Sequence, residues 1–129
     1  MYKRLFVLFL ALGLAGCVGS ASVPTPSTDF GPPPTDIESS VKTYFEHTLI
    51  DPFSAHYEFG VPYKAYEIAP LIAGGGIEWQ GWAVGVRVNS KNRFGGYVGW
   101  TTYHAFFKGN TVVEAYEEQE IDVLFHRID

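Results

Sequence analysis

The alternation of hydrophobic and polar residues predicts one helix followed by a series of β-strands. Between residues 36 and 50, hydrophobic side chains recur every three or four positions, which is the spacing of one buried helix face. Thr35 and Glu38 have capping-box spacing, and Pro52 disfavours helical geometry at the residue before it. We therefore expect an amphipathic helix from Asp36 to Ile50, with this buried face: Ile37, Val41, Tyr44, Phe45, Thr48 and Leu49.

Beyond the expected helix the period changes to two, which is the period of a strand with one buried face. Strands are predicted over residues 55–61, 82–89, 97–107 and 111–116, separated by polar or glycine-rich turns. A strand over 67–72 is interrupted by Pro70, and residues 117–129 fit either a helix or a strand. The predicted fold class is α+β, with one N-terminal amphipathic helix packed on a meandering antiparallel β-sheet.

Residues 18–35 show neither period. They contain five of the eight prolines of the chain, with glycine, serine and threonine between them. A segment of this composition buries too little apolar surface to fold by itself. We expect an extended tether, partly in polyproline II conformation, and at about 3 Å per residue it would hold a domain several nanometres from its attachment point.

The most hydrophobic stretch lies at the start of the chain. Two cations, Lys3 and Arg4, precede an uncharged run from Leu5 to Leu14, and small residues follow. This is the layout of a secretory signal peptide. The run is shorter than the roughly 20 residues that a transmembrane helix needs. We therefore predict that residues 1–16 are a signal peptide.

Cys17, the only cysteine of the chain, follows this stretch directly. The sequence Leu14-Ala15-Gly16-Cys17 resembles the lipobox of bacterial lipoproteins. The resemblance implies cleavage before Cys17, a diacylglycerol on its thiol and a fatty acid such as palmitate on the new amino group. Two or more acyl chains hold a protein stably on a bilayer. The alternative is an ordinary secreted protein with an incidental cysteine in its signal.

The predicted division of the chain is a signal peptide over 1–16, the acylated cysteine and tether over 17–35, and one domain over 36–129. Val18 stands where an aspartate retains the lipoproteins of enteric bacteria in the inner membrane. The resemblance therefore implies the outer membrane, facing the periplasm. The net charge of −5 disfavours nucleic acid as a partner, because phosphate binding needs clustered lysine and arginine.

The segment between two predicted strands, residues 89–96, is the strongest candidate for a binding site. Lys91 and Arg93 would project from this loop with Phe94 between them, and Asn92 tolerates turn geometry. The candidate binding residues for an anionic or glycan partner are Lys91, Asn92, Arg93 and Phe94. The alternative is a structural turn whose asparagine side chains cap the backbone.

Two short patterns resemble those of a family of small bacterial proteins that has no assigned activity. They are a DPxSA turn, here residues 51–55, and a VNxKNxFGGYxG hairpin, here residues 88–99. The resemblance implies a shared fold unit and no particular chemistry. Taken by itself, the segment from Asp51 to Ser54 is most simply a helix stop followed by a turn.

No pattern indicates a catalytic residue, a cofactor or a metal site. The histidines, His47, His56, His104 and His126, are far apart, and HExxH, GxSxG and P-loop patterns are absent from the sequence. Nothing selects a carboxylate pair such as Glu58 with Glu78. We expect most of the large aromatic residues to be in the core, whereas an exposed aromatic row would indicate sugar or protein binding. These residues are Trp79, Trp82, Tyr97, Trp100 and Tyr103.

The predicted function is that of a non-enzymatic interaction or structural module. It would be anchored in the cell envelope and would bind an envelope protein or glycan. One alternative, by analogy with other small lipoproteins, is an accessory lipoprotein of a secretion or conjugation machine. The other is a cell-wall hydrolase, which would need polar residues converging in a pocket near Lys91, Arg93 or His104.

Overall fold

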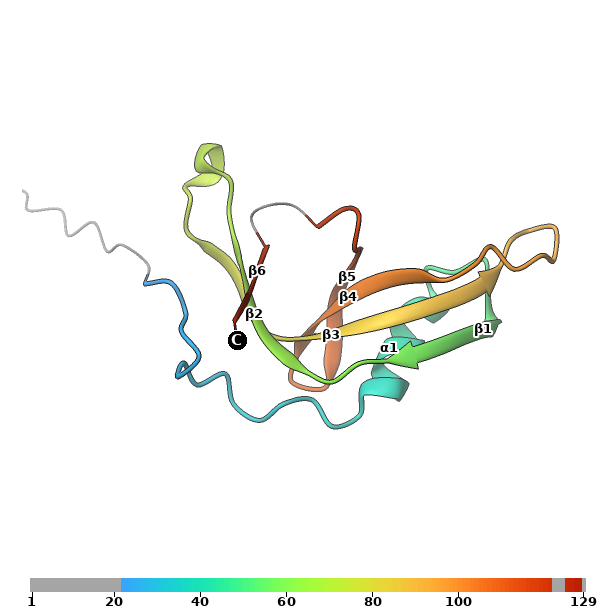
Figure 1. Ribbon diagram of the computed structural model, residues 1–129, viewed down its shortest axis with the longest axis horizontal. Helices are drawn as coiled ribbons and strands as arrows, with labels where there is room; N and C mark the ends of the chain where they lie inside the picture. The colour runs from blue at the N-terminus through green and yellow to red at the C-terminus, as the bar shows by residue number, and fades with distance from the viewer. Residues whose placement is uncertain (1–21, 122–124, 129) are drawn as a thin grey trace, which may run out of the picture.

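The structure, a computed structural model, describes residues 22–121 and 125–128, so the predicted signal peptide and Cys17 lie outside the described residues. The chain forms a mostly β domain with one helix and a six-stranded antiparallel sheet (Figure 1). The elements are α1 (Ile37–Glu46), β1 (Asp51–Phe59), β2 (Tyr63–Ile68), the 3-10 helix η1 (Leu71–Ala73), β3 (Ile77–Lys91), β4 (Thr101–Lys108), β5 (Thr111–Glu117) and β6 (Phe125–Ile128).

One helix with an antiparallel sheet is the predicted arrangement, and it is compatible with the α+β class. The helix precedes every strand, but it starts at residue 37 and is not at the N-terminus of the chain. The meander is confirmed for β2 to β5, which follow one another in the sheet as they do in the sequence. β1 and β6 depart from it, because both lie on the β2 side of β3.

The long strand β3 organises the sheet. It has 15 residues; its first part pairs with β2, and its second part pairs with β1. At about 3.3 Å per residue, such a strand spans up to about 45 Å. The β2–β3 hairpin therefore lies at one end of the molecule, and the loop between β3 and β4 lies at the other (Figure 1).

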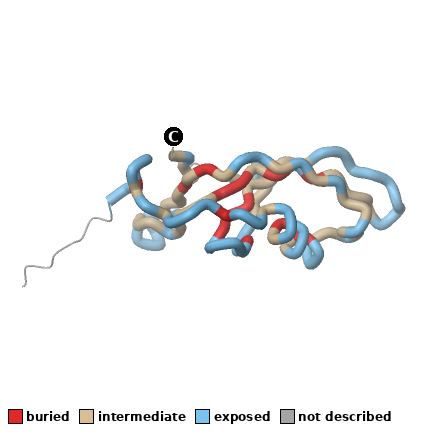
Figure 2. Tube along the Cα trace, turned by 90° about the horizontal axis from the view of Figure 1, so that it is seen from below, coloured by how far each residue is buried: buried red, intermediate tan, exposed pale blue. Residues whose placement is uncertain are grey.

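The sheet buries side chains on both faces. Val84 and Val86 of β3 are fully buried on the face covered by α1, together with Val41 and Phe45 of the helix. The neighbouring position, Ala83, points to the other face, because side chains alternate along a strand. There it belongs to a second core with Tyr63, Ala65 and Phe106, against which Trp79, Tyr116 and Phe125 pack. Figure 2 shows the buried positions along the middle of the molecule.

The helix boundaries differ from the predicted ones. α1 ends at Glu46 and not at Ile50, since the N–H groups of His47 and Thr48 donate to carbonyl oxygens only three residues earlier, those of Tyr44 and Phe45. Thr35 does not cap the helix. Its backbone N–H instead donates to Asn110 Oδ1, 2.8 Å away in the β4–β5 turn, and Asp36 occupies the N-cap position without a side-chain cap bond.

The strand predictions are largely confirmed, with shifted ends. β1 starts at Asp51, so the predicted turn over 51–54 belongs to a strand, although its pairing is irregular before His56. Ser54 donates from its backbone to Asp51 Oδ1 and from its hydroxyl to Asp51 O, which accounts for the turn-like sequence. For the ambiguous C-terminal stretch, residues 125–128 form a strand that pairs with β2.

The expected free tether is not what the structure shows for residues 22–35. Lys64 Nζ donates to the carbonyl oxygens of Pro26 and Thr28, at 3.0 and 2.6 Å, and Trp82 Nε1 donates to Gly31 O at 3.1 Å. Pro24 and Pro34 are buried. A proline-rich chain leaves its carbonyl groups without intrasegment partners. Here donors from the sheet use them, so this part of the chain lies against the domain.

Candidate functional site

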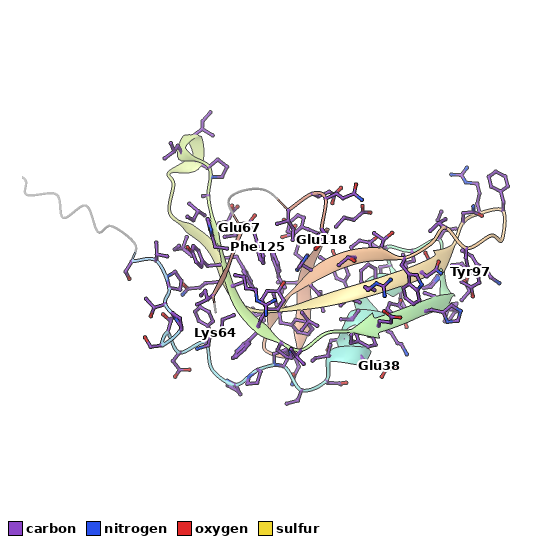
Figure 3. The ribbon with its side chains drawn as sticks, viewed as in Figure 1. Glu38, Lys64, Glu67, Tyr97, Glu118 and Phe125 are labelled. Carbon is purple, nitrogen blue, oxygen red and sulfur yellow. The ribbon has the colours of Figure 1, made fainter. Side chains whose placement is uncertain are left out.

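Two segments, residues 50–56 and 91–100, meet at the free end of the sheet, which we call the tip. Asp51 lies opposite Lys91 in the β1–β3 pairing. The Tyr97 hydroxyl donates to Ser54 O at 3.0 Å and lies 2.9 Å from His56 Nε2. These contacts bring the DPxSA and VNxKNxFGGYxG patterns together in space, at the right-hand end of Figure 1, and Tyr97 is labelled there in Figure 3.

The tip exposes a group of large apolar side chains. Phe53 is 93% exposed and Phe94 is 90% exposed, whereas Trp100 and Tyr97 keep rather less than half of their surface in water. A folded domain does not gather large hydrophobic groups at one end for its own stability, and such groups are typical of interaction surfaces. The exposed apolar set at the tip is Ile50, Phe53, Phe94, Tyr97, Val98 and Trp100.

Cations lie over the two half-exposed rings. Lys91 Nζ is 5.3 Å from the centre of the Tyr97 ring, and the Arg87 guanidinium is 4.9 Å from the centre of the Trp100 ring. Arg87 also forms a 2.5 Å ion pair with Glu58, the residue opposite it on β1. These contacts hold the rings in fixed orientations, so the tip presents ordered aromatic groups and positive charge side by side.

Of the two interpretations that the sequence left open for this loop, the structural turn is supported by its hydrogen bonds, and the binding role stays a prediction. Asn92 Oδ1 accepts hydrogen bonds from the backbone N–H groups of Phe94 and Gly96, at 2.9 and 3.2 Å. Gly95 has a φ of 79°, which favours glycine. Asn92 is therefore a structural turn residue. The loop is shorter than the predicted 89–96, because Lys91 is the last residue of β3 and is half-buried, whereas Arg93 and Phe94 are exposed in the turn.

Sequence reasoning missed several tip residues. Most of the five large aromatic residues were expected in the core, and Tyr97 and Trp100 are the two of them that are exposed; Phe53, expected in a simple turn, is exposed as well. Tyr103 and the other two tryptophans are half-buried against the two cores, as predicted. An available signal was the break in alternation after Asn92, where glycines separate aromatic residues that no strand period places inside.

Apart from the tip, a cluster of polar side chains lies on the sheet face opposite α1. The Tyr63 hydroxyl is 2.5 Å from His104 Nδ1, and His104 Nε2 is 3.9 Å from Glu118 Oε1. The Arg127 guanidinium lies 4.4 Å from the centre of the Tyr63 ring. Burial raises the pKa of Tyr63 to about 12, against a smaller lowering by Arg127. The Tyr63 hydroxyl therefore stays protonated at neutral pH and is a poor nucleophile.

The other histidines do not join this cluster. His56 stacks on Tyr97 at the tip, and His126 stacks on Tyr66 between β6 and β2. Within residues 22–121 and 125–128, no three His, Cys, Asp or Glu side chains are grouped closely enough to hold a metal ion. In the same ranges, no helix has the length and hydrophobicity needed to cross a bilayer.

His104 predicts a pH-dependent stability. Burial lowers its pKa below 6.5, although Glu118 opposes the shift, so below pH 6.5 the unfolded chain binds more protons at this residue than the folded chain does. The free energy of unfolding should therefore fall as pH decreases through this range. Urea unfolding at pH 7.5 and pH 5 should show a smaller pH-dependent loss for His104→Gln than for the wild type. Equal losses would contradict this role.

Two hollows of the described chain lie away from the His104 cluster. One of about 490 Å³ lies between α1 and the β4–β5 turn, lined mainly by hydroxyl-bearing side chains. Two of these hydroxyls already have internal partners: Ser40 Oγ donates to Asn110 O, and Thr48 Oγ1 donates to Tyr44 O. Another, of about 530 Å³, lies between residues 29–32 and β3. The first hollow lies where α1 packs on the sheet, and the second lies where the proline-rich segment packs on it.

Comparison with known proteins adds no assignment, because no family model, curated protein or solved structure matches the chain. The lipobox and the two short patterns of the tip therefore stay predictions from the sequence. The tip remains the place where exposed hydrophobic surface, ordered aromatic rings and cations coincide.

Proposed function

We propose that this protein is a non-enzymatic interaction module of the bacterial envelope, anchored through acylated Cys17 in the outer membrane and facing the periplasm. The observation that supports it best is the group of exposed apolar side chains at the tip. The anchor itself rests on the lipobox-like sequence. The described part of the chain begins at the end of the molecule opposite the tip (Figure 1), which suits a protein that presents its tip away from the membrane.

The chemistry of the tip favours a protein over a glycan as the partner. Trp100 and Tyr97, each beside a cation, suit either class, because sugars stack on aromatic rings and protein interfaces are rich in tryptophan, tyrosine and arginine. Phe53 and Phe94 are almost fully exposed and have no polar group to bond sugar hydroxyls. They suit hydrophobic pockets of a protein. The nearby Lys91 and Arg93 add positive charge, which suits an acidic rim around such pockets.

The anchor is tested by replacing the cysteine. The variant Cys17→Ser should carry no lipid, because it lacks the thiol to which the diacylglycerol is attached, and mass spectrometry of the wild type should find diacylglycerol at Cys17. The control is Ser39→Ala, an exposed change on α1 that leaves the lipobox intact. Wild-type protein recovered with a free thiol would overturn the proposed anchor.

The interaction role is tested by photo-crosslinking in cells. A photoreactive residue at position 98 of the tip should capture a discrete envelope protein, and the same residue at position 113 should not. Val98 and Val113 are both exposed valines, and Val113 lies on β5, away from the tip. If the captured partner belongs to a secretion or conjugation machine, the protein is an accessory lipoprotein of that machine. Capture of glycan alone, or equal capture at both positions, would contradict a protein-binding tip.

A further inference from the structure

The loop between β2 and β3 exposes two aliphatic side chains at the end of the molecule opposite the tip. Leu71 is 93% exposed and Ile72 is 100% exposed, both in the 3-10 helix η1. Residues 69–76 have the sequence Ala-Pro-Leu-Ile-Ala-Gly-Gly-Gly, which has no charged or polar side chain. An entirely apolar loop is costly to hold in water, so its exposure needs an explanation outside the domain.

The loop is compact and satisfies much of its own backbone. Ala69 N–H donates to Gly76 O at 2.8 Å and closes the loop, while Ala73 and Gly75 both donate to Pro70 O, at 2.8 and 3.2 Å. Gly74 N–H donates to Leu71 O at 3.0 Å. Backbone groups that enter a lipid environment must be paired internally, because no water is present there to bond them. These N–H groups are paired before any contact with lipid.

The described chain begins beside the base of this loop. Ser22 lines a shallow hollow of about 390 Å³ together with residues 77–80, the first residues of β3 after the loop. Figure 1 shows the start of the described chain (blue) and the loop between β2 and β3 at the same end of the molecule, away from the tip. Five peptide steps separate Ser22 from Cys17, which is at most about 18 Å for a fully extended chain. An anchor at Cys17 therefore keeps this end of the domain close to the bilayer.

We propose that the Leu71–Ile72 loop is a second membrane contact, which inserts into the bilayer surface beside the acylated Cys17. This inference rests on the proposed anchor. The expected surface is one of low charge, because exposed Glu78 lies close to the loop and the chain is net acidic. With the acyl chains and the loop both in the bilayer, the tip, which lies at the opposite end of the molecule from the loop (Figure 1), would face away from the membrane.

The test uses the full lipidated protein in vesicles of phosphatidylethanolamine and phosphatidylcholine. Because acylation blocks Cys17, the variants Ile72→Cys and Leu71→Cys each provide one free thiol for an environment-sensitive fluorophore. The matched control is Phe94→Cys, also a nearly fully exposed apolar position, but at the tip. We expect a blue shift and quenching by brominated lipid chains for labels at 71 and 72, and emission as in water for the label at 94.

The outcomes separate this inference from the anchor. Protein that floats with the vesicles but shows water-like emission at 71 and 72 would overturn the loop contact and leave the anchor in place. A blue shift at both positions without quenching by brominated lipid would mean that protein covers the loop, which also overturns it. Protein that does not float and accepts a second label at Cys17 would overturn the anchor, and the loop contact with it.

Discussion

Replacing Phe106 with alanine is expected to lower the free energy of unfolding by about 3–5 kcal/mol, the cost typical of a large aromatic removed from a core. Phe106 is 2% exposed at the centre of the second core. Its ring stacks on Trp79 at 4.4 Å and on Phe125 at 5.3 Å between ring centres. The variant therefore loses the group on which β3 and β6 both pack. For a domain of this size the melting temperature should fall by on the order of 15 °C.

The matched control is the same substitution at an exposed phenylalanine. Phe94→Ala removes a ring that is 90% exposed, so its melting temperature should stay close to that of the wild type. Thermal unfolding followed by near-ultraviolet circular dichroism compares the two variants. A loss below about 1 kcal/mol for Phe106→Ala would mean that the second core contributes little to stability. The sheet face opposite α1 would then be a surface layer.

The same Phe94→Ala variant is expected to lose partner binding. With Phe94 in a pocket of the partner, its truncation should reduce the binding free energy by about 2 kcal/mol, which raises the dissociation constant roughly 30-fold. The ring has almost no surface buried within the domain, so the loss cannot come from unfolding. Isothermal titration of the crosslinked partner, once purified, against wild type and variant gives this ratio.

Val113→Ala is the control for binding, because Val113 is an exposed apolar residue on β5 outside the tip. It should leave the dissociation constant within twofold of the wild-type value. Equal affinities of wild type and Phe94→Ala would show that the exposed ring is not part of the interface. Together the two phenylalanine variants separate stability from binding: Phe106→Ala affects the first, and Phe94→Ala affects the second.

The sequence predicted those elements whose side-chain pattern is local. The apolar spacing of Val41 and Phe45 is a property of a few helical turns, so α1 was predictable. The alternation in β3 was likewise visible, since one face of that strand is occupied by Val84, Val86 and Val88. The turn at Asn92 was predictable as well, because asparagine and glycine adopt it through their own side chain and backbone.

Features that depend on distant partners were not predictable in this way. Residues 22–35 were expected to extend freely, since nothing within them indicates that Lys64 and Trp82 would bond their carbonyl groups. The short strand β6 exists because β2 offers it an open edge, and its own four residues do not decide between helix and strand. The contact between Tyr63 and His104 joins β2 to β4 across β3.

The tip shows most clearly which features the local sequence determines and which depend on tertiary contacts. By itself the sequence determined the turn around Asn92 and marked Lys91, Arg93 and Phe94 as its projecting residues. Only the tertiary structure decided that Tyr97 and Trp100 are exposed. His56 stacks on Tyr97 and Arg87 lies over Trp100, and no further layer of the described part of the fold covers the two rings. Period and composition report how a segment folds locally, whereas exposure depends on which other segments pack against it.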